Sequence, residues 1–239
     1  MASTSETGHA KNVANFETLI TFCTGYGATY NPTNNELKIS SLQSTFDEAK
    51  LKLKAVKDSK GPFDMATGER QLLFKPLKPL ATRIINVMIA QNAAAPNVKD
   101  ARTIIRKLTG KRAGETTITT PEENQISVSQ QSYDRLVDSF EELIVVTQNE
   151  PNYNPNENEL KVATLQDLLT QLSASNTAVR NAYVPYSNAI ISRNDHFYEG
   201  DTALVNKAFD VKNYIKALFG ATSPQYRQIS SLVFKRPKE

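Results

Sequence analysis

Three side chains in the second half of the sequence could hold a metal ion: Asp195, His196 and Glu199, in the segment RNDHFYEGD. Carboxylate and imidazole groups of this kind bind divalent metals when a helix brings the donors together. A di-iron bundle needs two E-x-x-H motifs on facing helices, and the chain does not hold two of them. A surface or helix-end histidine is the favoured interpretation, so we expect no metal centre and keep these three residues as candidate ligands.

Other reactive groups point away from catalysis. The single cysteine, Cys23, follows Val13, Phe16 and Ile20 at helical spacing, which favours a buried thiol and rules out an intramolecular disulfide. The segment GYGATYNP lacks the third glycine of a dinucleotide loop, and TGKRAG lacks the other residues of a phosphate-binding loop. We therefore expect no catalytic residue, no cofactor and no nucleotide.

The alternating asparagines of NYNPNENEL resemble a calcium loop only superficially. Counting from Asn154, the sixth position is Glu159 and the twelfth is Leu165, where such a loop needs glycine and a bidentate glutamate. A turn followed by a capped helix N-terminus fits better, because Asn-Pro favours a turn and T-x-x-E forms a capping box. Each cap would contribute on the order of 1 kcal/mol. The predicted cap residues are Pro32, Thr33, Glu36, Pro155, Asn156 and Glu159.

This phrase occurs twice. The 14 residues from Tyr30 and the 14 from Tyr153 share nine identities, and the match continues downstream at the same offset of 123 residues. Upstream and further downstream the offset becomes 124, which a one-residue difference in a loop would explain. Agreement over most of each half predicts a tandem duplication of one unit. The seven-residue apolar spacing within it predicts helices, so the fold class is all-α with two pseudo-symmetric halves.

Each repeated unit is predicted to contain four helices. We expect one helical bundle at 1–109 and a second helical bundle at 132–239, joined by a linker or short β-hairpin at 110–131. Pro62 and Pro185 lie at matching points of the longest predicted helix in each half. A proline removes a backbone donor and clashes with the preceding turn, so we expect a kink or break at both.

Composition limits the class of protein. The 239 residues carry a formal net charge of +3 and a hydrophobic fraction of 39%, with no bias typical of disorder. This charge is too mild to indicate nucleic acid as a partner. No apolar run approaches the length of a membrane span, and the polar start shows no signal peptide, so we expect a soluble, cytoplasmic protein.

These patterns favour a non-enzymatic structural or protein-interaction protein whose partner is another protein or a second copy of itself. Two alternatives come from other classes. One is a membrane-active, pore-forming helical protein that would use the segment between the halves. The other is a small-molecule or metal-binding bundle, in which Asp195, His196 and Glu199 would line a pocket beside tyrosines such as Tyr183 and Tyr186.

Overall fold

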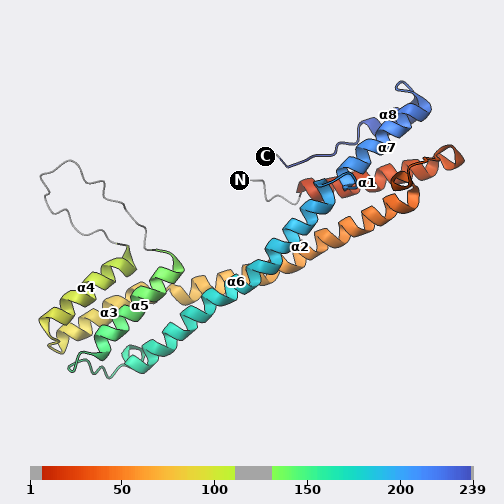
Figure 1. Cartoon of the computed structure of the whole chain (residues 1–239). Helices are drawn as coiled ribbons and strands as arrows, with labels where there is room; N and C mark the ends of the chain where they lie inside the picture. Colours follow the sequence, from red (N-terminus) through yellow and green to blue (C-terminus); the bar gives the residue numbers. More distant parts are fainter. Residues whose placement is uncertain (1–6, 111–130, 238–239) are drawn as a thin grey trace, which may run out of the picture. The chain divides into compact units, whose positions relative to one another are not determined.

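The computed structural model describes residues 7–110 and 131–237, and all regular structure within them is helical. The prediction of an all-α fold is therefore confirmed for these residues. The predicted linker or hairpin at 110–131 falls almost wholly outside them. The α-helices are α1 (Thr7–Gly25), α2 (Ile39–Phe74), α3 (Leu77–Ala90), α4 (Ala95–Thr109), α5 (Tyr133–Gln148), α6 (Val162–Tyr198), α7 (Leu204–Phe219) and α8 (Pro224–Ser230) (Figure 1). Short 3-10 helices are η1 (Gly27–Thr29), η2 (Asn35–Leu37) and η3 (Asn158–Leu160).

The helices form two compact units, and one of them is built from two separate stretches of sequence. Among the described residues, unit 1 combines the chain up to Pro62 with the chain from Tyr183, and unit 2 comprises Phe63 to Ala182. Two helices, α2 and α6, contribute residues to both units. A 36-residue helix is roughly 54 Å long, so its two ends lie beside different helices.

Both compact units therefore draw on both ranges predicted as domains, 1–109 and 132–239. Unit 1 takes α1 and the first part of α2 from the first range, and the end of α6 with α7 and α8 from the second. Unit 2 takes the end of α2 with α3 and α4 from the first range, and α5 with the start of α6 from the second. The predicted ranges divide the sequence into two halves, and each compact unit contains residues from both of them.

The core of unit 1 forms where the apolar faces of these helices meet. The stripe predicted on α1 is confirmed, because Val13, Phe16, Ile20 and Cys23 are all buried. The other apolar residues buried in the same cluster are Leu19, Tyr30, Leu37, Leu42, Phe46, Ala49, Phe197, Leu204, Val205, Ala208, Val211, Ile215, Ile229 and Phe234.

Unit 2 has its own separate core. On α5, burial follows the helical period at Leu136, Phe140, Leu143 and Ile144, and the helix begins where the Ser132 hydroxyl accepts a hydrogen bond from the Arg135 N–H at 3.3 Å. The remaining buried apolar residues of this cluster are Phe74, Leu77, Leu80, Ala81, Ile84, Ile85, Met88, Ala101, Ile104, Leu108, Tyr153, Leu160, Leu165 and Leu172.

Of the kink or break predicted at the two prolines, the break is wrong. Helix α2 continues through Pro62 and α6 continues through Pro185. Both prolines are exposed, and so are Asp58 and Asn181, whose carbonyls lose their helical partner. Water can satisfy those carbonyls, so the helix persists. The division between the two units nevertheless falls at Pro62 and two residues before Pro185.

Candidate functional site

The repeated phrase does not cap the long helices as predicted. We expected Thr33 to cap with Glu36 reaching back, but the Asn34 side chain instead accepts a hydrogen bond from the Glu36 N–H at 2.9 Å. Asn34 therefore caps η2, and Lys38 is extended before α2 begins at Ile39. Lys38 separates the 3-10 turn from the helix. The chain therefore forms η2 first and begins α2 only afterwards, where we had predicted a single helix start.

The second occurrence is arranged in the same way. Asn156 was expected to cap with Glu159, yet η3 follows Glu157, which makes no side-chain cap bond, and α6 begins only at Val162. The two prolines of the phrase, Pro32 and Pro155, are buried, which suits turn residues packed beneath the helix start.

A tyrosine holds each of these turns. The Tyr30 hydroxyl donates to the Leu37 carbonyl at 2.7 Å, and the Tyr153 hydroxyl donates to the Leu160 carbonyl at the same distance. Burial raises the pKa of both phenols, that of Tyr153 to about 12. Both hydroxyls therefore remain protonated donors in any ordinary buffer.

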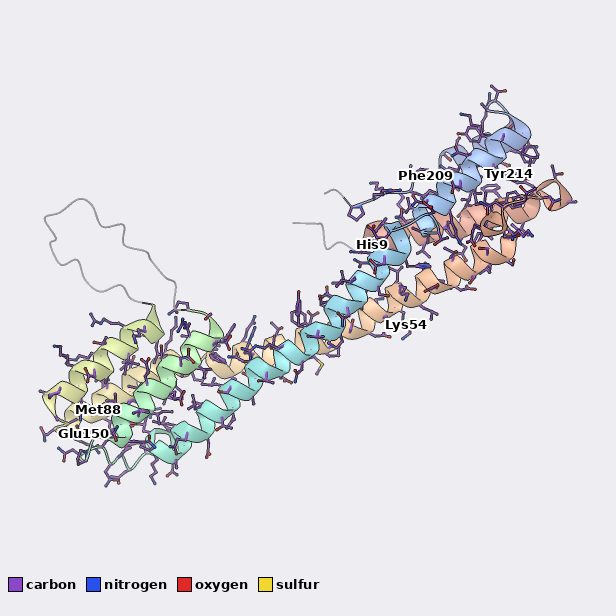
Figure 2. All side chains as sticks on the ribbon, in the orientation of Figure 1. His9, Lys54, Met88, Glu150, Phe209 and Tyr214 are labelled. Carbon is purple, nitrogen blue, oxygen red and sulfur yellow. The ribbon has the colours of Figure 1, made fainter. Side chains whose placement is uncertain are left out.

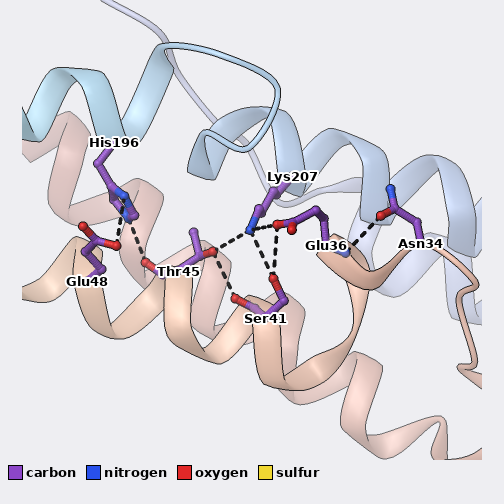
Figure 3. A network of polar contacts seen from close by, with 7 residues as sticks. All are labelled: Asn34, Glu36, Ser41, Thr45, Glu48, His196 and Lys207. Carbon is purple, nitrogen blue, oxygen red and sulfur yellow. Dashed lines mark hydrogen bonds and ion pairs between the residues drawn. The ribbon is translucent and has the colours of Figure 1, made fainter.

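The polar residues that meet in unit 1 form what we call the Lys207 network: Glu36, Ser41, Thr45, Glu48, His196 and Lys207 (Figure 3). Lys207 lies on α7 with its side chain only 6% exposed. Its ammonium is 2.6 Å from a Glu36 carboxylate oxygen, 3.2 Å from the Ser41 hydroxyl and 3.0 Å from the Thr45 hydroxyl. An ammonium has three N–H donors, so these contacts account for all of them.

The charges of this network are set by the pair of Lys207 and Glu36. The hydrogen bond from Lys207, and then its positive charge, hold the pKa of the Glu36 carboxyl below its usual value. The Ser41 hydroxyl donates to the same carboxylate at 3.3 Å. The site is therefore an ion pair buried on its cationic side and reachable by water on its anionic side.

A serine beside a lysine can also be a catalytic pair, in which a neutral amine takes the proton of the hydroxyl. Here a carboxylate 2.6 Å from Lys207 stabilises the charged ammonium, which cannot accept a proton. The Ser41 proton points to Glu36. The geometry ties η2 and α2 to α7 and does not activate Ser41.

His196 was a candidate metal ligand, and the structure turns it toward α2. Its Nε2 is 2.9 Å from the Thr45 carbonyl, and its Nδ1 is 3.7 Å from a Glu48 carboxylate oxygen. Because a carbonyl only accepts, Nε2 carries the proton of this hydrogen bond. His196 is thereby a link between α6 and α2.

The other two candidate ligands, Asp195 and Glu199, are exposed. In the part of the chain that the structure describes, no group of three or more His, Cys, Asp and Glu side chains is placed to hold a metal ion. Asp195, His196 and Glu199 are thus not brought together as a ligand set.

Unit 2 has a related pair where unit 1 has Glu36 and Lys207. Arg83 of α3 lies 2.6 Å from Glu159, and both side chains are about half exposed. At the positions that match Thr45 and His196, unit 2 has Leu168 and Leu73. A groove of about 470 Å³ lies between α3 and α6 at this place, and its lining includes Leu168 as well as Arg83 and Glu159.

Sequence reasoning missed a second polar tie, at Glu150 in unit 2. Its carboxylate accepts hydrogen bonds from the Asn97 side chain at 2.8 Å, the Ala94 N–H at 2.9 Å and the Asn152 N–H at 3.1 Å. The bond from Asn97, with those from the backbone, lowers the pKa of Glu150. Glu150, labelled in Figure 2, thereby holds the residue just before α4, Ala94, and the Asn97 side chain in the first turn of that helix.

Cys23 lies inside the core of unit 1. Burial raises the pKa of its thiol to about 12, far above that of a reactive cysteine. The prediction of a buried thiol is confirmed.

No protein-family model, curated protein or solved structure matches the chain. Among the described residues, every helix is too short or too polar to cross a bilayer.

Proposed function

We propose that this protein is a non-enzymatic structural or interaction protein, built by tandem duplication of a four-helix unit. The observation that carries the interaction role is a set of large apolar side chains left outside both cores at helical spacing. In unit 2, Met65 and Leu72 of α2 are 67% and 71% exposed. In unit 1, Val184 and Ile191 of α6 are 55% and 54% exposed.

The members of each pair are seven residues apart, which places them on one face of their helix, one above the other. Single exposed apolar residues are common on protein surfaces and need no explanation. Two on one line are the start of the a/d type of seam by which helices recognise each other. The partner would therefore be an amphipathic helix, from another protein or from a second copy of this chain.

The duplication is supported by contacts that recur at sequence-matched positions. The Tyr30 and Tyr153 bonds are one example. A second is the edge-to-face contact of His9 with Phe197, with 5.7 Å between ring centroids, which is matched by that of Tyr133 with Phe74 at 4.8 Å. In each ring pair the two residues come from opposite halves of the sequence.

A double variant, Met65→Ser with Leu72→Ser, tests the interaction role in the full-length chain. Sedimentation velocity over a hundredfold range of concentration measures self-association, and immobilised chain measures capture of helical partners from the source cell. We expect the double variant to lose whichever association the unaltered chain shows, with an unchanged circular dichroism spectrum.

Val145→Ser is the matched control, because Val145 is a 46% exposed apolar residue on α5 of the same unit. It should associate like the unaltered chain. A chain that stays monomeric and captures nothing, or a double variant that associates normally, would contradict the role of this face.

A further inference from the structure

Two glycines lie on the exposed face of α2 that carries Met65 and Leu72. Gly61 lies one turn before Met65 in the sequence. Gly68 lies between Met65 and Leu72, so the four residues follow one another at intervals of four, three and four. This is the spacing of the a and d positions in a seam between two helices. Along this line, a residue without a side chain alternates with a large and exposed apolar one.

The packing of the chain itself requires glycine at neither position. A Cβ atom added to Gly61 or to Gly68 would meet no other side chain or segment within 4 Å. Neither glycine has a positive φ angle. Glycine is also the least favourable residue in the interior of a helix apart from proline. The two glycines therefore leave open space beside Met65 and Leu72 that the described residues do not fill.

Charged residues of opposite sign lie one turn beyond each end of this line, Asp58 before it and Lys75 after it, and both are exposed. Lys75 directly follows α2, and its N–H still donates to the Gln71 carbonyl at 3.2 Å, so it continues the last helical turn. Asp58 pairs with Lys54 of the same helix at 2.5 Å, and both side chains are more than half exposed. An exposed pair of this kind is weak, so the Asp58 carboxylate is accessible to another cation.

The line is complementary to itself when a second copy of α2 runs in the opposite direction. A two-fold axis that passes between Ala66 and Thr67 brings residues at equal distances from this midpoint opposite each other, and each such contact occurs twice. Every resulting pair joins a large side chain to a glycine or an acid to a base. The pairs are Asp58 with Lys75, Gly61 with Leu72, and Met65 with Gly68.

A parallel pairing in register lacks this complementarity. It would place Asp58 opposite Asp58 of the second copy and Lys75 opposite its own equivalent. Like charges that face each other across an interface oppose association. The glycines would also face each other, which leaves their gaps empty while Met65 and Leu72 collide with their equivalents. The pattern therefore favours the antiparallel arrangement.

We infer that this face of α2 (Figure 1), from Asp58 to Lys75, binds a second copy of the same chain in an antiparallel, two-fold symmetric dimer. The inference rests on the proposed interaction role and names its partner. The distance between packed helices depends on the side chains at their contact, so the glycines let the two helices approach closely. Met65 and Leu72 of each copy then fill the open space beside the glycines of the other.

Cysteine cross-linking tests the direction of the pairing in the full-length chain. Gly61→Cys and Leu72→Cys are purified separately, mixed in equal amounts and oxidised, and the linked peptides are identified by mass spectrometry. We expect a disulfide between position 61 of one copy and position 72 of the other. Leu72→Cys alone should not cross-link, because its two equivalents lie about 16 Å apart along antiparallel helices, whereas a disulfide needs Cα atoms within about 7 Å. The unaltered chain is the control, since Cys23 is buried.

Filling a glycine gap tests the close approach of the helices. Gly68→Leu occupies the space that receives Met65 of the second copy, so the dissociation constant of the dimer, measured by sedimentation velocity, should rise at least about tenfold. The single chain should keep its circular dichroism spectrum, because leucine favours a helix and the space is open. Gly25→Leu makes the same change on α1, also beside open space, and should leave the dissociation constant unchanged.

Reversing the charges tests the ends of the line. Lys75→Glu faces the Asp58 carboxylate of the second copy at both ends, so the dissociation constant should rise about threefold or more. Adding Asp58→Lys to the same chain should restore association, because each pair is again of opposite charge. A double variant that associates no better than Lys75→Glu would contradict these contacts.

The outcomes separate this inference from the interaction role on which it rests. An unaltered chain that stays monomeric would overturn the inference, and helical partners captured through Met65 and Leu72 would still support the role. A disulfide between the two position-72 cysteines, or a Gly68→Leu chain that dimerises normally, would also overturn the antiparallel pairing alone. A chain that dimerises normally without Met65 and Leu72 would contradict both.

Discussion

Glu36 and Lys207 come from opposite halves of the sequence, and their carboxylate and ammonium groups lie 2.6 Å apart in unit 1. The positions that match them in the other half, Glu159 and Arg83, form an ion pair of the same length in unit 2. The burial of the two cations differs, since Lys207 is 6% exposed and Arg83 is 49% exposed. One ion pair therefore belongs to a core and the other to a surface.

That difference predicts unequal effects of removing the two cations. Lys207→Met takes away the donor that Ser41 and Thr45 share, so we expect the free energy of unfolding to fall by about 1 to 3 kcal/mol. Arg83→Met is the matched variant in unit 2 and should change it much less, because exposed pairs contribute little. Urea unfolding followed by circular dichroism measures both. Equal losses would contradict the distinction between core and surface.

Acid should destabilise the fold through Glu36 and Glu150. Both have a folded-state pKa below the usual 4.5, so each contributes stability that is fully present above about pH 4.5. That stability is lost as the pH falls through the lowered pKa values. Urea unfolding between pH 7 and pH 3 should show this decline, and Glu150→Gln should make it shallower. Glu141→Gln, on the exposed side of α5, should leave the slope unchanged.

Each compact unit contains helices from both halves of the sequence, and this predicts how the chain behaves when it is cut between the halves. With a protease site placed between residues 111 and 130, cleavage yields two fragments, each of which supplies helices to both units. We expect the fragments to elute together after cleavage and to separate only in denaturant. Each separated fragment should lack a cooperative unfolding transition, and mixing should restore it. Two fragments that part in native buffer would instead support domains at 1–109 and 132–239.

Cys23 offers a probe of unit 1, because it is the only cysteine in the chain. Its thiol is buried and its pKa is raised to about 12 by that burial, so thiol reagents should not modify it at pH 8 in the folded protein. Modification should appear with the urea transition of unit 1. Rapid stoichiometric labelling in native buffer would mean that the core around Phe16 and Ile20 opens readily.

The tertiary structure also reveals polar residues that a one-dimensional pattern hides. Lys207 lies on the apolar stripe of α7, between Leu204 and Val211, and Asn12 lies one turn before Phe16 on α1. In both cases, a polar residue within an apolar stripe was the feature of the sequence that could have indicated a buried polar contact. The partner of Lys207 is Glu36 and that of Asn12 is the Lys235 backbone, and both lie on distant segments that no local pattern identifies.

The sequence by itself determined the all-α class of the described residues and the buried stripe of Val13, Phe16, Ile20 and Cys23 on α1. These features depend on hydrogen bonds and apolar periodicity within a few turns. Only the tertiary structure decided that α2 and α6 run on past Pro62 and Pro185, and that each unit is assembled from both halves. Which helices share a core depends on contacts between residues far apart in the chain, and the matched halves carry similar apolar faces that suit either partner.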